Sequence, residues 1–259
     1  LLESGSEPRR LEMEVKLDET SHPYLRGHSI NGTAVVPLVM AAQWMARMAR
    51  AFRPDLELTK LTDLKVLKGV VLDGFKNGGD RFKVRCRKLS NGEGVTLMVT
   101  VESPAGVPHY RAQAHMSERA EPLGAGKPQI DAGSWDGPAL YEDGSLLFHR
   151  EGFRVIQNLE GVSPQGAAAR LTIEDSDQPQ AGEVGVFDGG LQLAVLWSGK
   201  QLDSNVDLDQ FTRDRFRREL LCPDSSQPIA IHDGVPIRTK RIPNQGNIPI
   251  GSDVLSHAG

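Results

Sequence analysis

The sequence predicts an α+β protein in which an antiparallel sheet wraps around one buried helix, and in which this unit is built twice. Alternating apolar and polar residues, interrupted by hairpin-type turns, fill residues 61–116, as is typical of an antiparallel meander. Two segments, 36–52 and 186–199, are apolar almost all round, which predicts helices covered on most sides. Strand-like runs accompany each helix, so the pattern indicates two similar halves.

The first half is expected to begin with a strand over residues 11–17, LEMEVKL, because apolar and charged residues alternate there. In the helix predicted over 36–52, Gln43, Arg47 and Arg50 form one narrow polar stripe. Turn sequences NGG, SNGEG and SPAG, which suit β-hairpins, separate most of the strands that follow. These strands are expected over residues 61–72, 80–89, 94–103 and 109–116.

A segment rich in glycine, proline and charge predicts a linker, 121–138, between an N-terminal subdomain, 1–120, and a C-terminal subdomain, 139–259. Strands are expected over 147–159 and 167–173, ahead of the second apolar helix. Few strands can be recognised after that helix. The second subdomain is therefore expected to lack its final strands, or to hide them from pattern analysis.

Composition narrows the classes of protein. The chain has 259 residues, 39% apolar and 25% charged, which is ordinary for a globular protein. A net charge of −4 gives no basic excess, so nucleic acid is not an expected partner. Charged residues interrupt the longest apolar run too early for a membrane span, and the first ten residues do not resemble a secretory signal.

Two cysteines, Cys86 and Cys222, are too few for a zinc site or a disulfide framework. Cys86 occupies an inward position of its predicted strand, which indicates a buried free thiol. These features fit a reducing cytoplasm. The sequence also lacks nucleotide-binding and metalloprotease motifs, so no metal or cofactor is expected.

Two motifs carry the chemistry. HSINGTAVVP fits the pattern H-x-x-x-G-x-x-x-x-P with His28, Gly32 and Pro37, and DGGLQ fits D-x-x-x-Q with Asp188 and Gln192. Each motif lies next to an apolar helix. A third segment, LLFHREGF, contains two further candidate site residues, His149 and Phe153.

These motifs, in this order and spacing, resemble those of dehydratase domains from polyketide synthases and related fatty-acid synthases. The lead-in HPYLRGH is similar to that family as well. The resemblance implies a double hot-dog fold, with a catalytic histidine from the first half and a catalytic aspartate from the second. The sequence departs from the family in the third motif, LLFHREGF, where Arg150-Glu151 replace the usual Gly-Pro. This difference puts the shape of the substrate tunnel in question.

A neutral imidazole is a suitable base near neutral pH, so His28 is the expected proton acceptor, although a hydrogen-bonded loop histidine is the plain alternative. Backbone N–H groups near Gly32, close to the helix start, are expected to bind the thioester oxygen. The glycine itself would let the substrate approach the backbone. Pro37 suits the first turn of the helix, where its missing N–H has no cost.

Asp188 is expected at a helix start, where an N-cap is the plain alternative to catalysis. Gln192 lies on the same helix face and would orient the carboxyl. In an apolar pocket the pKa of the Asp188 carboxyl would rise, which would let it act as the proton donor. His149 and Phe153 are expected to line the substrate tunnel.

A basic cluster in the second half is either a solvated helix face or a docking site for an acidic carrier protein; its members are Arg213, Arg215, Arg217 and Arg218.

Taken together, the motifs and their resemblance predict a dehydratase (a hydro-lyase) that removes water from a β-hydroxyacyl thioester held on the phosphopantetheine of an acyl carrier protein. The alternatives are a hot-dog isomerase or thioesterase, and a non-catalytic dehydratase-like module. Neighbouring synthase domains are expected partners, a homodimer is possible, and the third motif leans towards synthases of polyunsaturated fatty acids.

Overall fold

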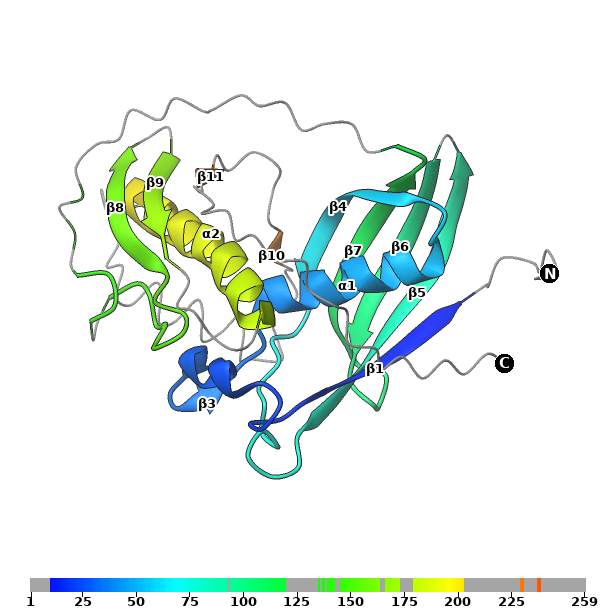
Figure 1. Ribbon diagram of the computed structural model, residues 1–259, viewed down its shortest axis with the longest axis horizontal. Helices are drawn as coiled ribbons and strands as arrows, with labels where there is room; N and C mark the ends of the chain where they lie inside the picture. Colours follow the sequence, from blue (N-terminus) through cyan, green and yellow to red (C-terminus); the bar gives the residue numbers. More distant parts are fainter. Residues whose placement is uncertain are drawn as a thin grey trace.

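The computed structural model describes residues 10–92, 94–119, 139–142, 145–163, 166–172 and 179–202, together with residues 135, 137, 229–230 and 237–238. It shows two main sheets, each accompanied by one long helix (Figure 1). The α+β class predicted from the sequence is confirmed. None of the described helices is long and apolar enough to span a membrane.

The larger sheet has the order β1-β5-β6-β7-β4-β10. Its strands are β1 (Leu11–Leu17), β4 (Glu57–Val66), β5 (Asp80–Gly92), β6 (Gly94–Glu102), β7 (Pro108–Ser117) and β10 (Ile229–Ala230). All pairs in this sheet are antiparallel. The predicted meander is therefore present, although β4 begins earlier and ends earlier than expected, and residue Val71 makes a separate bridge to Val35.

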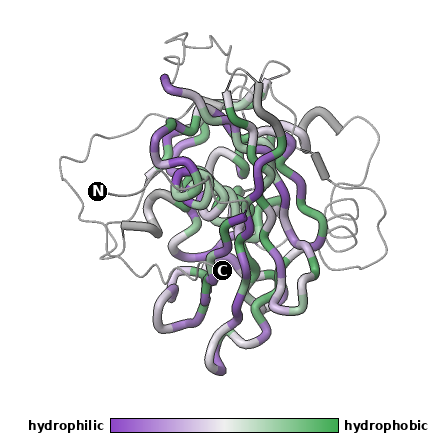
Figure 2. The backbone as a smooth tube through the Cα atoms, turned by 90° about the vertical axis from the view of Figure 1, so that its right-hand side faces the viewer, coloured by the Kyte–Doolittle hydropathy of each residue, from purple (hydrophilic) through white to green (hydrophobic). Residues whose placement is uncertain are grey.

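Helix α1 (Leu38–Phe52) lies across the concave side of this sheet (Figure 1). Its apolar residues recur at helical spacing, so one broad face is buried against the strands. The buried members are Val39, Met40, Ala41, Trp44, Met45, Met48, Ala49 and Phe52. On the strands, hydrophobic and hydrophilic residues follow each other in turn, which Figure 2 shows as repeated changes of colour along the tube. Cys86 is buried on the inner face of β5, as predicted.

The second half has a three-stranded sheet with the order β11-β9-β8. It comprises β8 (Ile156–Ser163), β9 (Gly166–Leu171) and β11 (Ile237–Arg238), and α2 (Pro179–Leu202) packs against it. β11 pairs with β9 in parallel, whereas β8 and β9 are antiparallel. The short strands β10 and β11 follow α2 in the chain, and β10 joins the sheet of the first half.

The two halves share buried contacts. Phe153 and Val184, from the second half, belong to the hydrophobic core that surrounds α1. The N-terminal ends of α1 and α2 meet near the middle of the molecule (Figure 1). The subdomain boundaries 1–120 and 139–259 stay a prediction, and nearly all of the linker 121–138 lies outside the described residues.

Two expectations about the second half are wrong. Residues 147–155 form no strand, because Arg150 N–H donates to Gly27 O at 2.8 Å instead of to a neighbouring strand, and Gly152 has a φ of 82°. Regular pairing begins only at Ile156. The second helix is also longer than the predicted 186–199, since it begins at Pro179, a residue tolerated in the first helical turn.

Candidate functional site

His28 is positioned by a small hairpin that explains the spacing of the first motif. Strands β2 (Ser29–Ile30) and β3 (Thr33–Ala34) are joined by Asn31 and Gly32, whose φ angles are 52° and 80°. Positive φ at both turn residues is the type I′ geometry that Asn-Gly favours. The turn brings residue 35 back beside residue 28, so that Val35 N–H donates to His28 O at 3.0 Å.

Gly32 therefore serves the turn. It is exposed, and a Cβ at this position would meet no described atom within 4 Å. This corrects the expectation that Gly32 lies near the helix start and lets the substrate approach, because α1 begins only at Leu38. Pro37 is buried and is the N-cap of α1, one position before the first turn in which it was expected.

The ring of His28 is held in one tautomer. Its Nδ1–H donates to Val35 O at 2.9 Å, because a carbonyl can only accept, and this leaves Nε2 with a free lone pair in the neutral ring. The side chain is buried, with Phe153 and Phe148 ring centres 5.1 and 5.0 Å away. Burial lowers the pKa of His28 to about 4, although the nearby Asp188 opposes this change. His28 is thus neutral at physiological pH.

Asp188 lies in the middle of α2, so the N-cap alternative is wrong. Glycines in this helix allow it to approach its neighbours closely. A Cβ at Gly189 would lie 2.7 Å from Val155 Cγ2 and 2.9 Å from Leu171 Cδ1. The two glycines that follow Asp188 in the second motif therefore include one that the packing of α2 on β9 requires.

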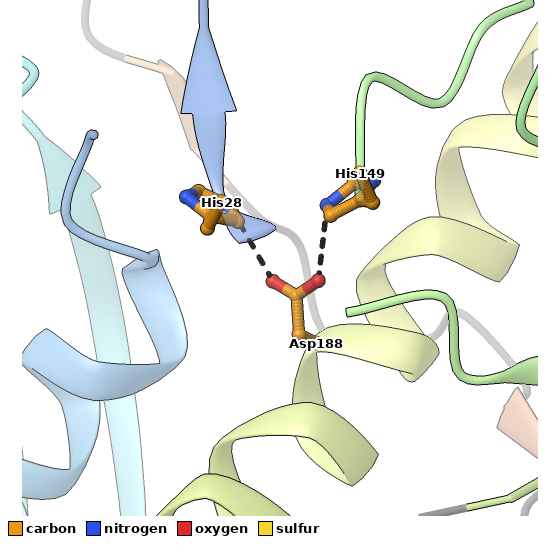
Figure 3. Close-up of side chains that lie close together, drawn as sticks. All are labelled: His28, His149 and Asp188. Atoms are coloured by element: carbon orange, nitrogen blue, oxygen red, sulfur yellow. Dashed lines mark ion pairs between the residues drawn. The ribbon is translucent and has the colours of Figure 1, made fainter. Parts of the chain in front are cut away.

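The carboxyl of Asp188 lies between two histidines (Figure 3). His149 Nε2 is 3.0 Å from Oδ2, and His28 Nε2 is 3.9 Å from Oδ1. Gln192 donates to Oδ2 at 2.8 Å, which confirms the expected orienting contact one helical turn away. The expected pair is therefore brought together, one residue from each half.

Gln192 is fixed in turn by its own partners. Its amide N–H₂ also donates to Phe153 O at 2.9 Å, and its Oε1 accepts from the Tyr141 hydroxyl at 2.7 Å. The same hydroxyl accepts from Ile156 N–H at 2.9 Å. Sequence reasoning missed Tyr141, because a tyrosine that precedes the third motif carries no local signal of this role.

The electrostatics of Asp188 differ from the expectation. Burial raises the pKa of its carboxyl, but the hydrogen bonds that His149 and Gln192 donate and the electrostatic interaction with the two histidine rings outweigh burial and lower it. The expectation of a raised pKa is therefore wrong for the resting site. The missing information was His149, which sequence analysis placed on the tunnel wall rather than on the carboxyl.

His149 belongs to the irregular segment 147–155, which packs its backbone on the residue before His28. A Cβ at Gly27 would lie only 2.0 Å from Glu151 O, so only glycine fits there. The exposed Arg150-Glu151 pair thus contributes its backbone to the contact. Phe153, the other expected tunnel residue, is buried against the ring of His28.

His28, His149 and Asp188 are also the one group of described residues that could hold a metal ion, since their ligand atoms lie within 4.8 Å of one another. The 3.0 Å contact between His149 Nε2 and Asp188 Oδ2 has the length of an ordinary N–H···O hydrogen bond and needs no ion to explain it. The basic cluster around Arg213 and Cys222 lie outside the described residues.

Comparisons with known proteins bear on the fold. No family model matches the chain. It is 28% identical over 178 residues to one of the subunits of the polyunsaturated fatty acid synthase of Thraustochytrium sp.; these residues are 64% of this chain and 6% of that protein. The chain thus spans only a small part of its relative.

Two solved structures are similar over most of this chain. The dehydratase domain from the CurF module of curacin polyketide synthase has a TM-score of 0.58 and 12% identity, with coverage of 81% of this chain and 75% of that one. A structure that bears on dehydratase substrate selection for the borrelidin and fluvirucin polyketide synthases has a TM-score of 0.52 and 13% identity, with coverage of 76% and 71%. The chain has the fold of polyketide synthase dehydratase domains.

This fold is the double hot-dog expected from the sequence, and it accounts for the two helix-and-sheet halves. At such low identity the likeness concerns the fold, so the chemistry has to be argued from the site.

Proposed function

We propose that this chain is a dehydratase that removes water from a β-hydroxyacyl thioester to give an α,β-unsaturated acyl chain. The observation that carries the proposal is the buried pair of His28 Nε2 and Asp188 Oδ1, which lie 3.9 Å apart, with one residue from each half of the fold. The free lone pair of a neutral imidazole and a carboxyl oxygen face each other there. Elimination of water needs a base and an acid placed in this way.

In the proposed reaction, His28 Nε2 takes the proton from the α-carbon, and the electrons of that C–H bond form the double bond. The bond between the β-carbon and the hydroxyl oxygen breaks, and its electron pair leaves with the oxygen. That oxygen takes a proton from Asp188 Oδ1 and departs as water. His28 is then an imidazolium facing the Asp188 carboxylate, and return of the proton from one to the other resets the site.

The low pKa of His28 fits the first step, because the ring stays neutral and able to accept a proton over the whole physiological range. The low resting pKa of Asp188 means that the proton-bearing carboxyl is a minor form near neutral pH. The alkaline side of the pH–rate profile should therefore report the loss of this proton.

We further propose that the substrate is tethered through phosphopantetheine to an acyl carrier protein, and that the chain is a part of a larger cytoplasmic synthase. Support comes from the relative, whose name is that of a polyunsaturated fatty acid synthase subunit. Neighbouring synthase domains would then be its partners, and the acid–base pair alone would supply the chemistry, without a metal or cofactor.

The test is incubation with β-hydroxyacyl-pantetheine thioesters of several chain lengths, followed by mass spectrometry. We expect loss of one water in the wild type and a rate lower by about 10²–10⁴-fold in His28→Ala and in Asp188→Asn. His115→Ala on β7 and Asp55→Asn are controls that should keep the wild-type rate, because both residues lie in the first half away from the site.

Other products decide between the alternatives. A shifted double bond without loss of water would indicate an isomerase, and a free acid would indicate a thioesterase. If the folded wild type leaves every thioester unchanged, the catalytic proposal is refuted in favour of a non-catalytic module.

A further inference from the structure

His149 faces the Asp188 carboxyl oxygen that His28 does not face, and it belongs to neither of the two paired motifs (Figure 3). Its ring is buried, and its Nε2 is 3.0 Å from Asp188 Oδ2. A carboxylate oxygen accepts, so Nε2 carries the hydrogen of this bond. In the reaction above, this histidine has no assigned part.

The two oxygens of the Asp188 carboxyl have different hydrogen-bond partners. Oδ2 accepts from both His149 Nε2 and Gln192 Nε2. Oδ1 is left facing His28 Nε2, which is 3.9 Å away. A proton on the carboxyl is therefore directed to Oδ1, which is the oxygen that would meet the leaving hydroxyl.

We propose that His149 is a positioning residue, which through its hydrogen bond to Oδ2 determines both where and over which pH range Asp188 carries the proton for the leaving hydroxyl. This inference rests on the proposed dehydratase function. It assigns His149 a role on the acid rather than on the tunnel wall.

Of the charged and titratable groups around Asp188, His149 is the one that can be substituted to change the protonation of the carboxyl without removing the proposed base. His28 faces Oδ1 from the first half and is needed as the base. Tyr141 reaches Asp188 only through Gln192, and burial raises the pKa of its hydroxyl to about 12, so it stays neutral. The Arg154 guanidinium contacts backbone oxygens of His149 and Tyr141 at 3.4 Å rather than the carboxyl.

The surroundings of His149 also hold its ring in place. Phe148 stacks on it at a centroid distance of 4.3 Å, and the backbone N–H of Arg150 donates a hydrogen bond to Gly27 O. The hydrogen bond to Asp188 is therefore formed by a side chain with little freedom to leave it. Nδ1 of the same ring is buried and has no hydrogen-bond partner among the described residues.

Two substitutions separate the hydrogen bond from the bulk of the ring. His149→Phe keeps an aromatic ring for stacking on Phe148 but removes the donor and any positive charge. His149→Gln keeps an amide N–H that can reach Oδ2, without the charge. His115→Phe, on β7, is the matched control.

The first measurement does not depend on activity. Infrared difference spectra between each protein and its Asp188→Asn counterpart give the pH at which the Asp188 carboxyl becomes protonated. We expect His149→Phe to raise this midpoint by about 1–2 pH units, because a hydrogen bond to a charged group is worth that much. His149→Gln should give a smaller rise, and His115→Phe should give none.

The second measurement is kcat/KM for dehydration as a function of pH. The alkaline fall in rate should move upward in His149→Phe by the same number of pH units as the infrared midpoint. A merely structural role would lower the rate equally at every pH and leave the profile in place.

The outcomes separate the two proposals. An unchanged infrared midpoint in both folded variants overturns the role of His149, whether or not the protein is active. A shifted midpoint with an unshifted rate profile overturns the link between His149 and the acid step. Absence of water loss in the wild type refutes the dehydratase function while the infrared result still shows whether His149 sets the protonation of Asp188.

Discussion

Gly27→Ala is expected to push the segment that carries His149 away from the residue before His28, without altering a side chain of the candidate site. The added Cβ would lie 2.0 Å from Glu151 O, where ordinary contacts are about 3.5 Å. The segment that carries His149 must therefore move away by roughly 1.5 Å. This displacement also strains the 2.8 Å hydrogen bond from Arg150 N–H to Gly27 O.

Two contributions set the size of the effect on stability. Overpacking of a close contact costs about 1–3 kcal/mol, and loss of one backbone hydrogen bond costs about 0.5–1.5 kcal/mol. Together they amount to about 3 kcal/mol, which lowers the Tm of a chain of this size by about 6–12 °C. Displacement of the site by about 1 Å can also lower a rate by about 10²-fold.

The assay combines a thermal melt with the dehydration rate on a pantetheine-bound substrate, both for Gly27→Ala and for Gly106→Ala. Gly106 lies in the β6–β7 turn with a φ of 82°, and a Cβ there meets nothing within 4 Å. It should lose about 1–2 kcal/mol from backbone strain alone and keep its rate. Equal melting and equal rates in the two variants would refute the argument that the 147–155 segment presses on Gly27.

Three further predictions concern single side chains. Tyr141→Phe removes the hydroxyl shared by Gln192 and Ile156 N–H, so chemical denaturation should show a loss of about 1–3 kcal/mol, and an unchanged midpoint would contradict the bonding described. Because the pKa of His28 is about 4 in the folded state and 6.5 in the reference state, protonation of the unfolded chain should reduce wild-type stability as the pH falls from 6.5 to 4, by on the order of 3 kcal/mol. His28→Ala should lack this dependence, and parallel stability curves for the two proteins would argue against it. Burial raises the pKa of Cys86 to about 12, so a thiol reagent at pH 8 should leave Cys86 unmodified until the protein is denatured.

Local periodicity was enough to predict α1 and most strands of the larger sheet in the first half. In β5, Phe82, Val84 and Cys86 are buried and alternate with charged residues, and α1 buries its apolar face at helical spacing. In both elements, the residues that decide burial are close neighbours in the sequence. The predicted strand and helix therefore needed no knowledge of distant contacts.

The segment 147–155 shows where this reasoning fails. Leu147, His149, Phe153 and Val155 are all buried at odd positions, which imitates a strand. Their burial comes from contacts with the first half and with α2, and no strand pairs with this backbone in the described chain. Periodicity records which side chains are buried but not which backbone groups are paired.

The meeting of His28, Asp188 and Gln192 was predicted from the sequence, but the electrostatics of the site were not. His28, Asp188 and Gln192 meet as expected because their motifs encode the hairpin and the helix that carry them. The pKa of Asp188 depends on the hydrogen bond that His149 donates. His149 lies on a different segment, and only the tertiary fold brings it to the carboxyl. An Asn-Gly dipeptide signals the hairpin at Gly32, and that signal was available in the sequence.

The composition of α2 has a consequence for the order of folding. This helix contains five glycines, whereas α1 contains none. Each glycine costs about 1 kcal/mol relative to alanine, so α2 is about 5 kcal/mol less favourable as an isolated helix than an alanine-containing equivalent. Its close packing contacts with Val155 and Leu171 must therefore be available before the helix becomes stable.

The newly made chain should therefore acquire the sheet around α1 before it acquires the helix that bears the carboxyl. Pulse-labelled hydrogen exchange during refolding would reveal this as amide protection in α1 and β5–β7 ahead of protection in α2. Helix α2 would then form on Val155 and Leu171, and Asp188 would reach its final position later than His28.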